Sequence, residues 1–255
     1  MSLWQFKGCY HKPASVLILT TAMLTAACQN IPVGEDAAIS DSLDKSAIAA
    51  ERANDYSTAI DQYQKLLKRD PENVDVIVGL ARNLRYSGES TNAVKILEKL
   101  GPKENVPISY RMELAKSKIA AGKAKAAIKQ LTLALADEPD NWEIYSALGI
   151  AHDLNEDYVK ARQAYEKARA LSEDNPAVLN NMAMSAALSG DIDRAIALLH
   201  STPRLARHNP QIRQNLAFFY GIKGDMKSAE SLARMDLDEK EVRTNLTFFS
   251  RFQKK

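Results

Sequence analysis

The stretch WEIYSALGIAHDLNEDYVKARQAYEKARALSEDN, residues 142–175, decides the fold of this chain. It reads as two short amphipathic helices separated at residues 155–157, because apolar or small side chains recur at three- and four-residue spacing on both sides of that break. Such a helical hairpin cannot bury both of its apolar faces by itself. The sequence therefore predicts that the hairpin recurs along the chain.

The hairpin pattern does recur, in blocks that start at residues 40, 74, 108, 142, 176 and 210 and lie 34 residues apart. Small side chains at the eighth and twentieth positions let two helices approach to the short end of the roughly 8–10 Å interaxial range. These residues are Ala47, Ala81, Ala115, Gly149, Ala183 and Ala217 at position eight, and Ala59, Ala93, Ala127, Ala161, Ala195 and Ala229 at position twenty. Position fifteen is glycine in four blocks, where a helix end favours a residue that tolerates positive φ.

The period, the small residues and the turn glycines together resemble the tetratricopeptide repeat over residues 40–243. The resemblance implies an all-α protein that forms a right-handed superhelical solenoid of about six helical hairpins. After the last block, residues 239–253 form one more amphipathic pattern, with Val242, Leu246 and Phe249 on one stripe. We expect this helix to cap the solenoid.

The first 27 residues contain Lys7 and Lys12, no acidic residue, and an apolar or small run over residues 14–27. That run is shorter than the roughly 20 residues that a membrane-spanning helix needs. A basic start followed by a short apolar run predicts a secretory signal peptide over residues 1–27.

The residues that end this run, Leu-Thr-Ala-Ala-Cys at 24–28, resemble a bacterial lipoprotein box. The resemblance implies that Cys28 is acylated and anchors the chain to a membrane. Because residues 29–39 contain Pro32 and Gly34 and show no apolar periodicity, we expect residues 28–39 to form the lipidated cysteine and a tether. Because Gln29 rather than aspartate follows Cys28, the resemblance further implies the outer membrane, on its periplasmic face. Ordinary cleavage to a free periplasmic protein is the alternative.

The candidate chemistry is sparse. Without its signal peptide the chain has one cysteine, Cys28. Its histidines form no i, i+4 pair with a nearby carboxylate, the pattern of a zinc-binding helix. His152 occupies position eleven, where we expect a buried histidine with its hydrogen bonds satisfied. The acids at position sixteen are expected to cap the second helices or to favour their N-termini by charge: Asp55, Glu89, Asp157, Asp191 and Asp225. We therefore expect no enzyme, no catalytic residue, no metal, no cofactor and no small-molecule substrate.

The charge balance also limits the partners. Without Lys7 and Lys12 the basic residues equal the acidic ones in number, so charge gives no argument for nucleic acid. The third block alone is basic, with Lys116 and five other cations before residue 137. This basic block is either a solvated face or a docking patch for an acidic partner.

The repeat resemblance implies that the first helices line a concave groove. The residues expected to face it are Arg82, Arg85 and Lys116 in the amino half, and Asn180, Asn181, Met184, Gln214, Asn215 and Phe218 in the carboxyl half. The asparagines at position six can hydrogen-bond a bound peptide backbone, while Met184 and Phe218 hold its side chains. The alternative is that position six simply tolerates polar residues in solvent.

A narrower resemblance lies in the last two blocks. Residues 179–183 (LNNMA), 213–217 (RQNLA), 224–225 (GD) and the short ending at 233–237 (ARMDL) resemble the TadD lipoproteins of Flp/Tad pilus assembly. That implies a protein partner in the pilus machinery, and an outer-membrane lipoprotein that helps its secretin assemble or localise. The alternatives are a pilotin or subunit of another envelope assembly complex, or a cytosolic adaptor if residues 1–27 are retained.

Overall fold

The structure is a computed structural model that describes residues 33–101, 106–203 and 208–251. Within these ranges every regular element is a helix, which confirms the all-α prediction. The helices are α1 (Val33–Arg52), α2 (Tyr56–Arg69), α3 (Val74–Tyr86), α4 (Ser90–Lys99), α5 (Ile108–Ala120), α6 (Ala124–Asp137), α7 (Trp142–Leu154), α8 (Tyr158–Leu171), α9 (Pro176–Leu188), α10 (Ile192–His200), α11 (Pro210–Lys223), α12 (Met226–Ala233) and α13 (Glu239–Ser250).

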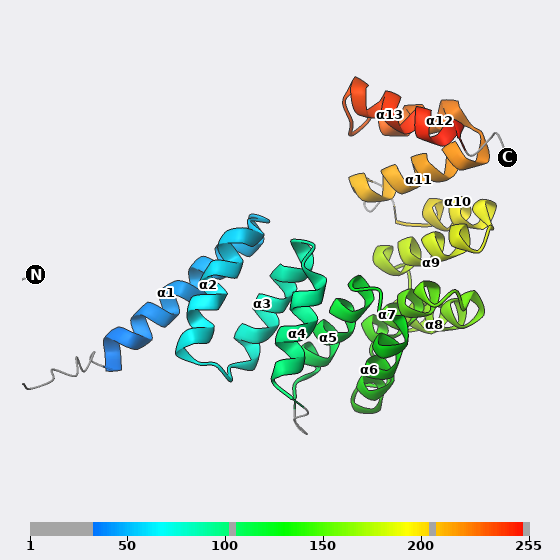
Figure 1. Cartoon of the computed structure of the whole chain (residues 1–255). Coiled ribbons are helices and arrows are strands. Elements are labelled where there is room, and N and C mark those ends of the chain that lie inside the picture. The colour runs from blue at the N-terminus through cyan, green and yellow to red at the C-terminus, as the bar shows by residue number, and fades with distance from the viewer. Residues whose placement is uncertain (1–32, 102–105, 204–207, 252–255) are drawn as a thin grey trace, which may run out of the picture.

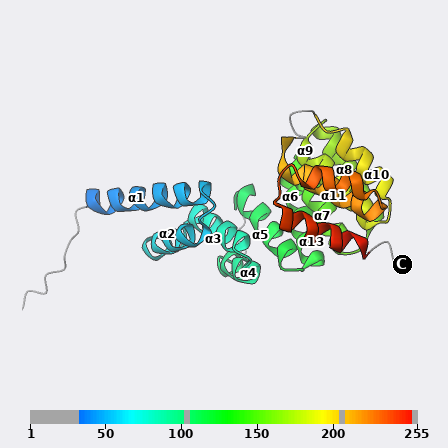
Figure 2. The same cartoon turned by 90° about the horizontal axis from the view of Figure 1, so that it is seen from above.

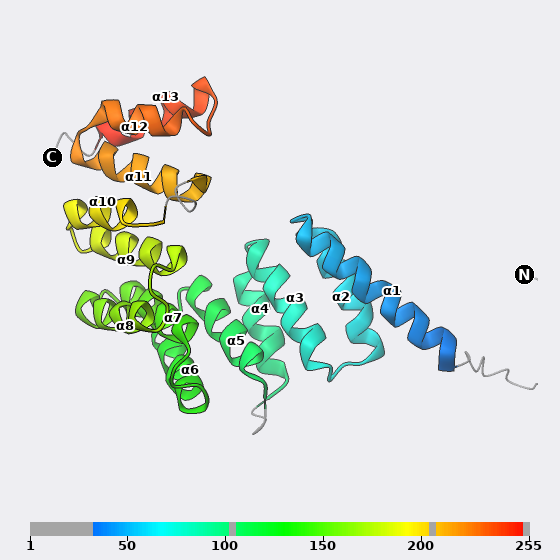
Figure 3. The ribbon, with the colours of Figure 1, turned by 180° about the vertical axis from the view of Figure 1, so that it is seen from behind.

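The helices alternate as first and second members of hairpins, and each pair packs on the next pair along the chain. The first helices α3, α5, α7, α9 and α11 begin at residues 74, 108, 142, 176 and 210, where the sequence blocks begin. The result is a solenoid that curves through the picture from α1 at one end to α13 at the other (Figures 1 and 3).

The segment before the first block differs from the prediction. We expected an irregular tether up to residue 39, but α1 begins at Val33 and continues without a break into the first block. Seen from above, α1 extends away from the other helices at the amino end of the solenoid (Figure 2). Residues 33–39 contain five small or apolar residues beside two acids and no proline, and Gly34 near the helix start is the only strong helix-disfavouring residue among them.

The repeat positions predicted to be small are buried. All six alanines at position twenty have no exposed surface, and those at position eight are at most 1% exposed. Gly88, Gly122, Gly190 and Gly224 have positive φ, as do Asn54 and Glu156 at position fifteen of the other two repeats. The hairpin turns therefore share one left-handed residue, whichever side chain occupies it.

The capping prediction holds for the four aspartates at position sixteen. Each accepts a hydrogen bond from a backbone N–H in the first turn of its second helix: Asp55, Asp157, Asp191 and Asp225. Glu89 occupies the same N-cap place in α4 but makes no such hydrogen bond, so of the two expected roles only that of a charge near the helix N-terminus remains for it. Its longer side chain is suited to reach back from inside a helix rather than to cap from this position.

Helix α13 ends the solenoid. It packs on α11 and α12 in the way that α9 packs on α7 and α8. A capping box at Asp238 and Glu241 begins it, and Val242 and Phe249 are its buried residues. The expected terminal helix is therefore present, and it covers the last hairpin.

Candidate functional site

The first helices of the repeats, α1, α3, α5, α7, α9 and α11, form a face that we call the first-helix face. From α3 to α11 each first helix packs on the next one. All nine residues that the sequence placed in a groove lie on these helices, on α3, α5, α9 and α11. The structure also gives most of them a partner within the chain, and this changes what they can offer to a ligand.

The asparagines at position six join neighbouring repeats. Asn181 Nδ2 donates to Ser146 Oγ across 3.1 Å, and Asn215 Nδ2 donates to Asn180 Oδ1 across 2.7 Å. In both cases position six of one repeat reaches position five of the preceding one. We call this set of four residues the amide ladder. The side-chain oxygens of Asn181 and Asn215 accept no hydrogen bond from the described part of the chain, so they can accept one from a ligand.

Gln214 is held by the end of the solenoid. Its Nε2 donates to Asp236 Oδ2 across 2.9 Å, and Arg213 Nε donates to the same oxygen across 2.9 Å. The Arg213 guanidinium beside Asp236 holds the pKa of that carboxyl below its usual range. The Arg-Gln-Asn run in α11 and the Asp-Leu ending before α13 are thus two halves of one contact.

Phe218 packs beneath α13. Its ring stacks on that of Phe248 with centroids 6.5 Å apart, and it lies 5.9 Å from the ring of Phe249. We expected Phe218 to hold a ligand side chain, but it is half-buried, whereas Phe248 is 46% exposed. Met184 on α9 is likewise half-buried against the core. Of these phenylalanine rings, Phe248 is the most exposed, and the sequence analysis did not include it.

The cations of the amino half are paired across repeats. Arg82 Nη1 lies 3.1 Å from Glu51 Oε1, and Arg85 donates through Nε and Nη2 to both carboxylate oxygens of Glu113, at 2.7 and 3.1 Å. Lys116 Nζ lies 3.6 Å from Glu143 Oε2. These ion pairs therefore join one repeat to the next. Two further cations of the third repeat, Arg111 and Lys118, lie close to Asp137 and Glu98.

A wide hollow of the first-helix face lies between α1 and α3, which pack on each other less closely than the later first helices do. It encloses about 900 Å³. Acids outnumber bases in its lining, which includes Asp41, Asp44, Glu51 and Asp75 against Arg52 and Arg82. We call it the acidic hollow. The signal that could have found it is aspartate at position two of the first two blocks, Asp41 and Asp75, together with Asp44 at position five of the first.

The floor of the acidic hollow is apolar, with Leu66, Val78 and the ring of Tyr63. Tyr63 donates a hydrogen bond to Glu51 Oε2 at 3.2 Å. Burial, together with the Glu51 carboxylate, raises the pKa of Tyr63 to about 12. The tyrosine therefore remains neutral at ordinary pH and serves as a donor that orients Glu51.

His152 is less satisfied than expected. It is half-buried, and its Nδ1 has no hydrogen-bond partner within the described ranges. Burial lowers its pKa, which favours the neutral ring. Since no group of three metal-ligating side chains occurs in the part of the chain that the structure describes, we find no metal site around it.

Family comparisons agree with this architecture. Models of the tetratricopeptide repeat match residues 50–116 and 154–217, and a second model of the same repeat matches residues 112–176. The chain belongs to the tetratricopeptide repeat (TPR) family. The repeats of such proteins are scaffolds that bind other proteins. No curated protein matches the chain significantly along its sequence.

Solved TPR structures resemble this solenoid. A thermophilic TPR protein from Thermus thermophilus matches with a TM-score of 0.63 and 19% identity, over 71% of this chain and 98% of that one. A TPR protein from Parabacteroides merdae matches with a TM-score of 0.54 and 12% identity, over 83% of this chain and 98% of that one. MamA from Desulfovibrio magneticus matches with a TM-score of 0.51 and 16% identity, over 63% of this chain and 91% of that one. At these identities the likeness shows the TPR fold alone.

Two expectations lie partly or wholly outside what the structure describes. Cys28 and the signal peptide precede residue 33, so the lipid attachment and the localisation stay predictions. Within the described ranges, no helix of the TPR solenoid is long and apolar enough to cross a membrane.

Proposed function

We propose that this TPR protein is a non-catalytic scaffold that binds a protein segment along the first-helix face. The observation that carries the proposal is the arrangement of that face from end to end. The acidic hollow lies at its amino end, the oxygens of the amide ladder lie along α9 and α11, and Phe248 lies at its carboxyl end. An extended segment can meet charge, hydrogen-bond acceptors and an aromatic ring in that order.

We further propose where the scaffold works. The resemblance of Cys28 to an acylated cysteine supports a lipid anchor at the outer membrane, on its periplasmic face. The resemblance of the last two repeats to TadD supports a role in assembling or localising the secretin of a Flp/Tad pilus. The contact between Arg213 and Asp236 adds a structural reason for that run of residues, because it fixes α11 against the turn before α13.

Crosslinking in intact cells tests the partner. A photoreactive amino acid at Ile150 or at Phe248, both partly exposed on or beside the first-helix face, should give adducts with a secretin or another pilus-assembly protein. The matched control is Lys167, which is exposed on the second helix α8. Adducts with a different secretin or envelope complex support the role as pilotin or subunit elsewhere. Adducts from Lys167 alone contradict the assignment of the face.

Fractionation tests the anchor. Cys28→Ala should release the protein from the outer-membrane fraction and abolish incorporation of labelled fatty acid. The same variant should keep the helix content of the parent because residue 28 precedes the solenoid. A variant that stays in that fraction and loses no label contradicts the lipid anchor.

A further inference from the structure

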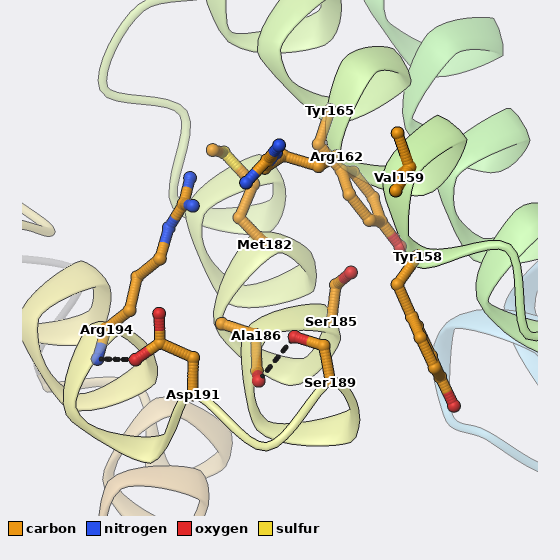
Figure 4. Close-up of a pocket in the computed structure, with 10 residues that line it drawn as sticks. All are labelled: Tyr158, Val159, Arg162, Tyr165, Met182, Ser185, Ala186, Ser189, Asp191 and Arg194. Atoms are coloured by element: carbon orange, nitrogen blue, oxygen red, sulfur yellow. Dashed lines mark hydrogen bonds between the residues drawn. The ribbon is translucent and has the colours of Figure 1, made fainter.

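A separate crevice opens on the side of the solenoid formed by the second helices. It lies between α8 and α10, with α9 as its floor, and encloses about 220 Å³ (Figure 4). The floor is buried and largely apolar: Tyr165, Met182 and Ala186 are 2%, 4% and 8% exposed. Val159 at the rim is 61% exposed. We call this site the outer crevice.

The outer crevice exists because two repeat positions change together. Position twenty-one is aliphatic in the first, second, third and fifth repeats, and in the crevice it shares the lining with position eleven of the next repeat. In the fourth repeat position twenty-one is Arg162, which is exposed, and position eleven of the fifth repeat is only Ala186. The corresponding pairs elsewhere are Ile60 with Leu84, Val94 with Lys118, Ile128 with His152, and Ile196 with Tyr220. One aliphatic side chain is therefore missing from the space between these two repeats.

The mouth of the outer crevice carries two guanidinium groups. Figure 4 shows Arg162 from α8 and Arg194 from α10 pointing toward one another across Met182. Arg194 Nη2 donates to Glu166 Oε1 at 3.1 Å, but no acidic partner is recorded for Arg162 within the described ranges. Asp191 also lines the crevice, and its carboxylate caps α10 by accepting from the backbone N–H of Arg194. The free positive charge at the mouth is therefore that of Arg162.

We propose that the outer crevice binds a partner protein through one aliphatic side chain that is followed by an acidic residue. The aliphatic side chain takes the space that position twenty-one fills in other repeats, and the carboxylate pairs with Arg162. A volume of about 220 Å³ is below the roughly 300–1,000 Å³ of pockets for whole small molecules, and it suits a single side chain. The flexible thioether of Met182 lets the floor adapt to leucine or isoleucine.

The methionines of α9 provide a direct test. Met182 lies in the outer crevice, whereas Met184, two residues later, lies on the first-helix face. Full-length protein with ¹³C-labelled methionine methyl groups is titrated with acetyl-Ser-Leu-Asp-Glu-Ser-amide, and the two signals are assigned with Met182→Leu and Met184→Leu. The expected result is a saturable shift of the Met182 methyl in the millimolar range, as befits one side chain and one exposed ion pair, with the Met184 methyl unmoved.

Two further peptides and two variants separate the contributions. Replacing the leucine of the peptide by serine should abolish the shift, and replacing its two acids by lysine should weaken binding about fivefold. Arg162→Ile restores the aliphatic residue of other repeats and should abolish binding while keeping the fold. Ala186→Leu introduces at position eleven of the fifth repeat the leucine that the second repeat has there, Leu84. This larger side chain should fill the crevice and also abolish binding.

The outcomes that overturn the proposal are distinct. A shift of Met184 alone, or of both methyls with equal dependence on peptide concentration, means that the peptide binds elsewhere. No shift at Met182 up to several tens of millimolar means that the outer crevice binds no such side chain. An Arg162→Ile variant that folds normally and binds as well as the parent also contradicts the proposal.

Discussion

Gly149 in α7 lies directly under the ring of Tyr165 in α8, so that a Cβ on Gly149 would overlap that ring. Three repeats with alanine at position eight have leucine at position twenty-four: Ala81 with Leu97, Ala115 with Leu131, and Ala183 with Leu199. The first repeat combines Ala47 with Tyr63, but that ring lies against Gly79 of the next repeat. In the fourth repeat the ring of Tyr165 instead lies on Gly149 of its own hairpin. The phenol also reaches Asp153, donating to its Oδ2 at 2.9 Å.

This pairing predicts that Gly149→Ala destabilises the protein although alanine is the usual residue at position eight. Overpacking costs about 1–3 kcal/mol, of which better helix propensity returns up to about 1 kcal/mol. Chemical denaturation measures the difference. The double variant with Tyr165→Leu should lose less than the two single variants added together. Additive losses would contradict the steric account.

The contact between Asn180 and Asn215 predicts an energetic coupling between α9 and α11. A double-mutant cycle with alanine at both positions should give a coupling of about 0.5–1.5 kcal/mol in the free energy of unfolding. Asn181 paired with Ser146 should behave similarly. A coupling near zero in both cycles would mean that the amide ladder serves ligand binding and adds nothing to stability.

The ion pair of Arg213 with Asp236 predicts a pH dependence of stability. Because the pKa of Asp236 is lower in the folded than in the unfolded state, its charged form stabilises the fold above the ordinary aspartate pKa of about 3.9. That contribution is lost as the pH falls through the lowered, folded-state pKa. Thermal midpoints of Asp236→Asn should therefore lie below those of the parent at neutral pH and approach them in acid. Asp140→Asn, at an exposed loop residue, is the control and should show no such convergence.

The difference between the caps predicts unequal effects at position sixteen. Asp191→Ala removes a side-chain hydrogen bond to the first turn of α10 and should cost about 1 kcal/mol. Glu89→Ala removes no such bond from α4 and should cost clearly less. Equal losses in urea denaturation would show that charge near the helix end, rather than the hydrogen bond, carries the effect.

The sequence predicted the solenoid well because its signal is repeated. A small side chain at positions eight and twenty, such as Ala81 or Ala93, is needed in every hairpin, so the same residue type recurs at a fixed spacing. The starts of five first helices and the left-handed turn residues follow from that periodicity. The early start of α1 was missed because residues 33–39 lie before the first block and carry no repeat signal.

The candidate site was harder to predict because its contacts run between repeats. Asn215 looked available for a ligand when its own repeat was considered alone, yet its amide donates to Asn180 in the preceding one. Arg85 was expected to face the groove, but its partner Glu113 belongs to the next repeat. Phe218 is covered by α13, whose position over α11 depends on the turn after α12. Pairs of this kind appear only when residues about one period apart are compared.

Helix α13 gives the two ends of the molecule different capacities for growth. Its Phe249 fills the space over Gly221, the place that another hairpin would need in order to stack on α11. The surface of α1 has no comparable cover among the described residues. If copies of this protein, or a helical partner, were to lengthen the solenoid, the addition would occur at the α1 end only. Two copies of this protein joined in this way would meet α1 to α1 and face opposite ways, so their assembly would end at two.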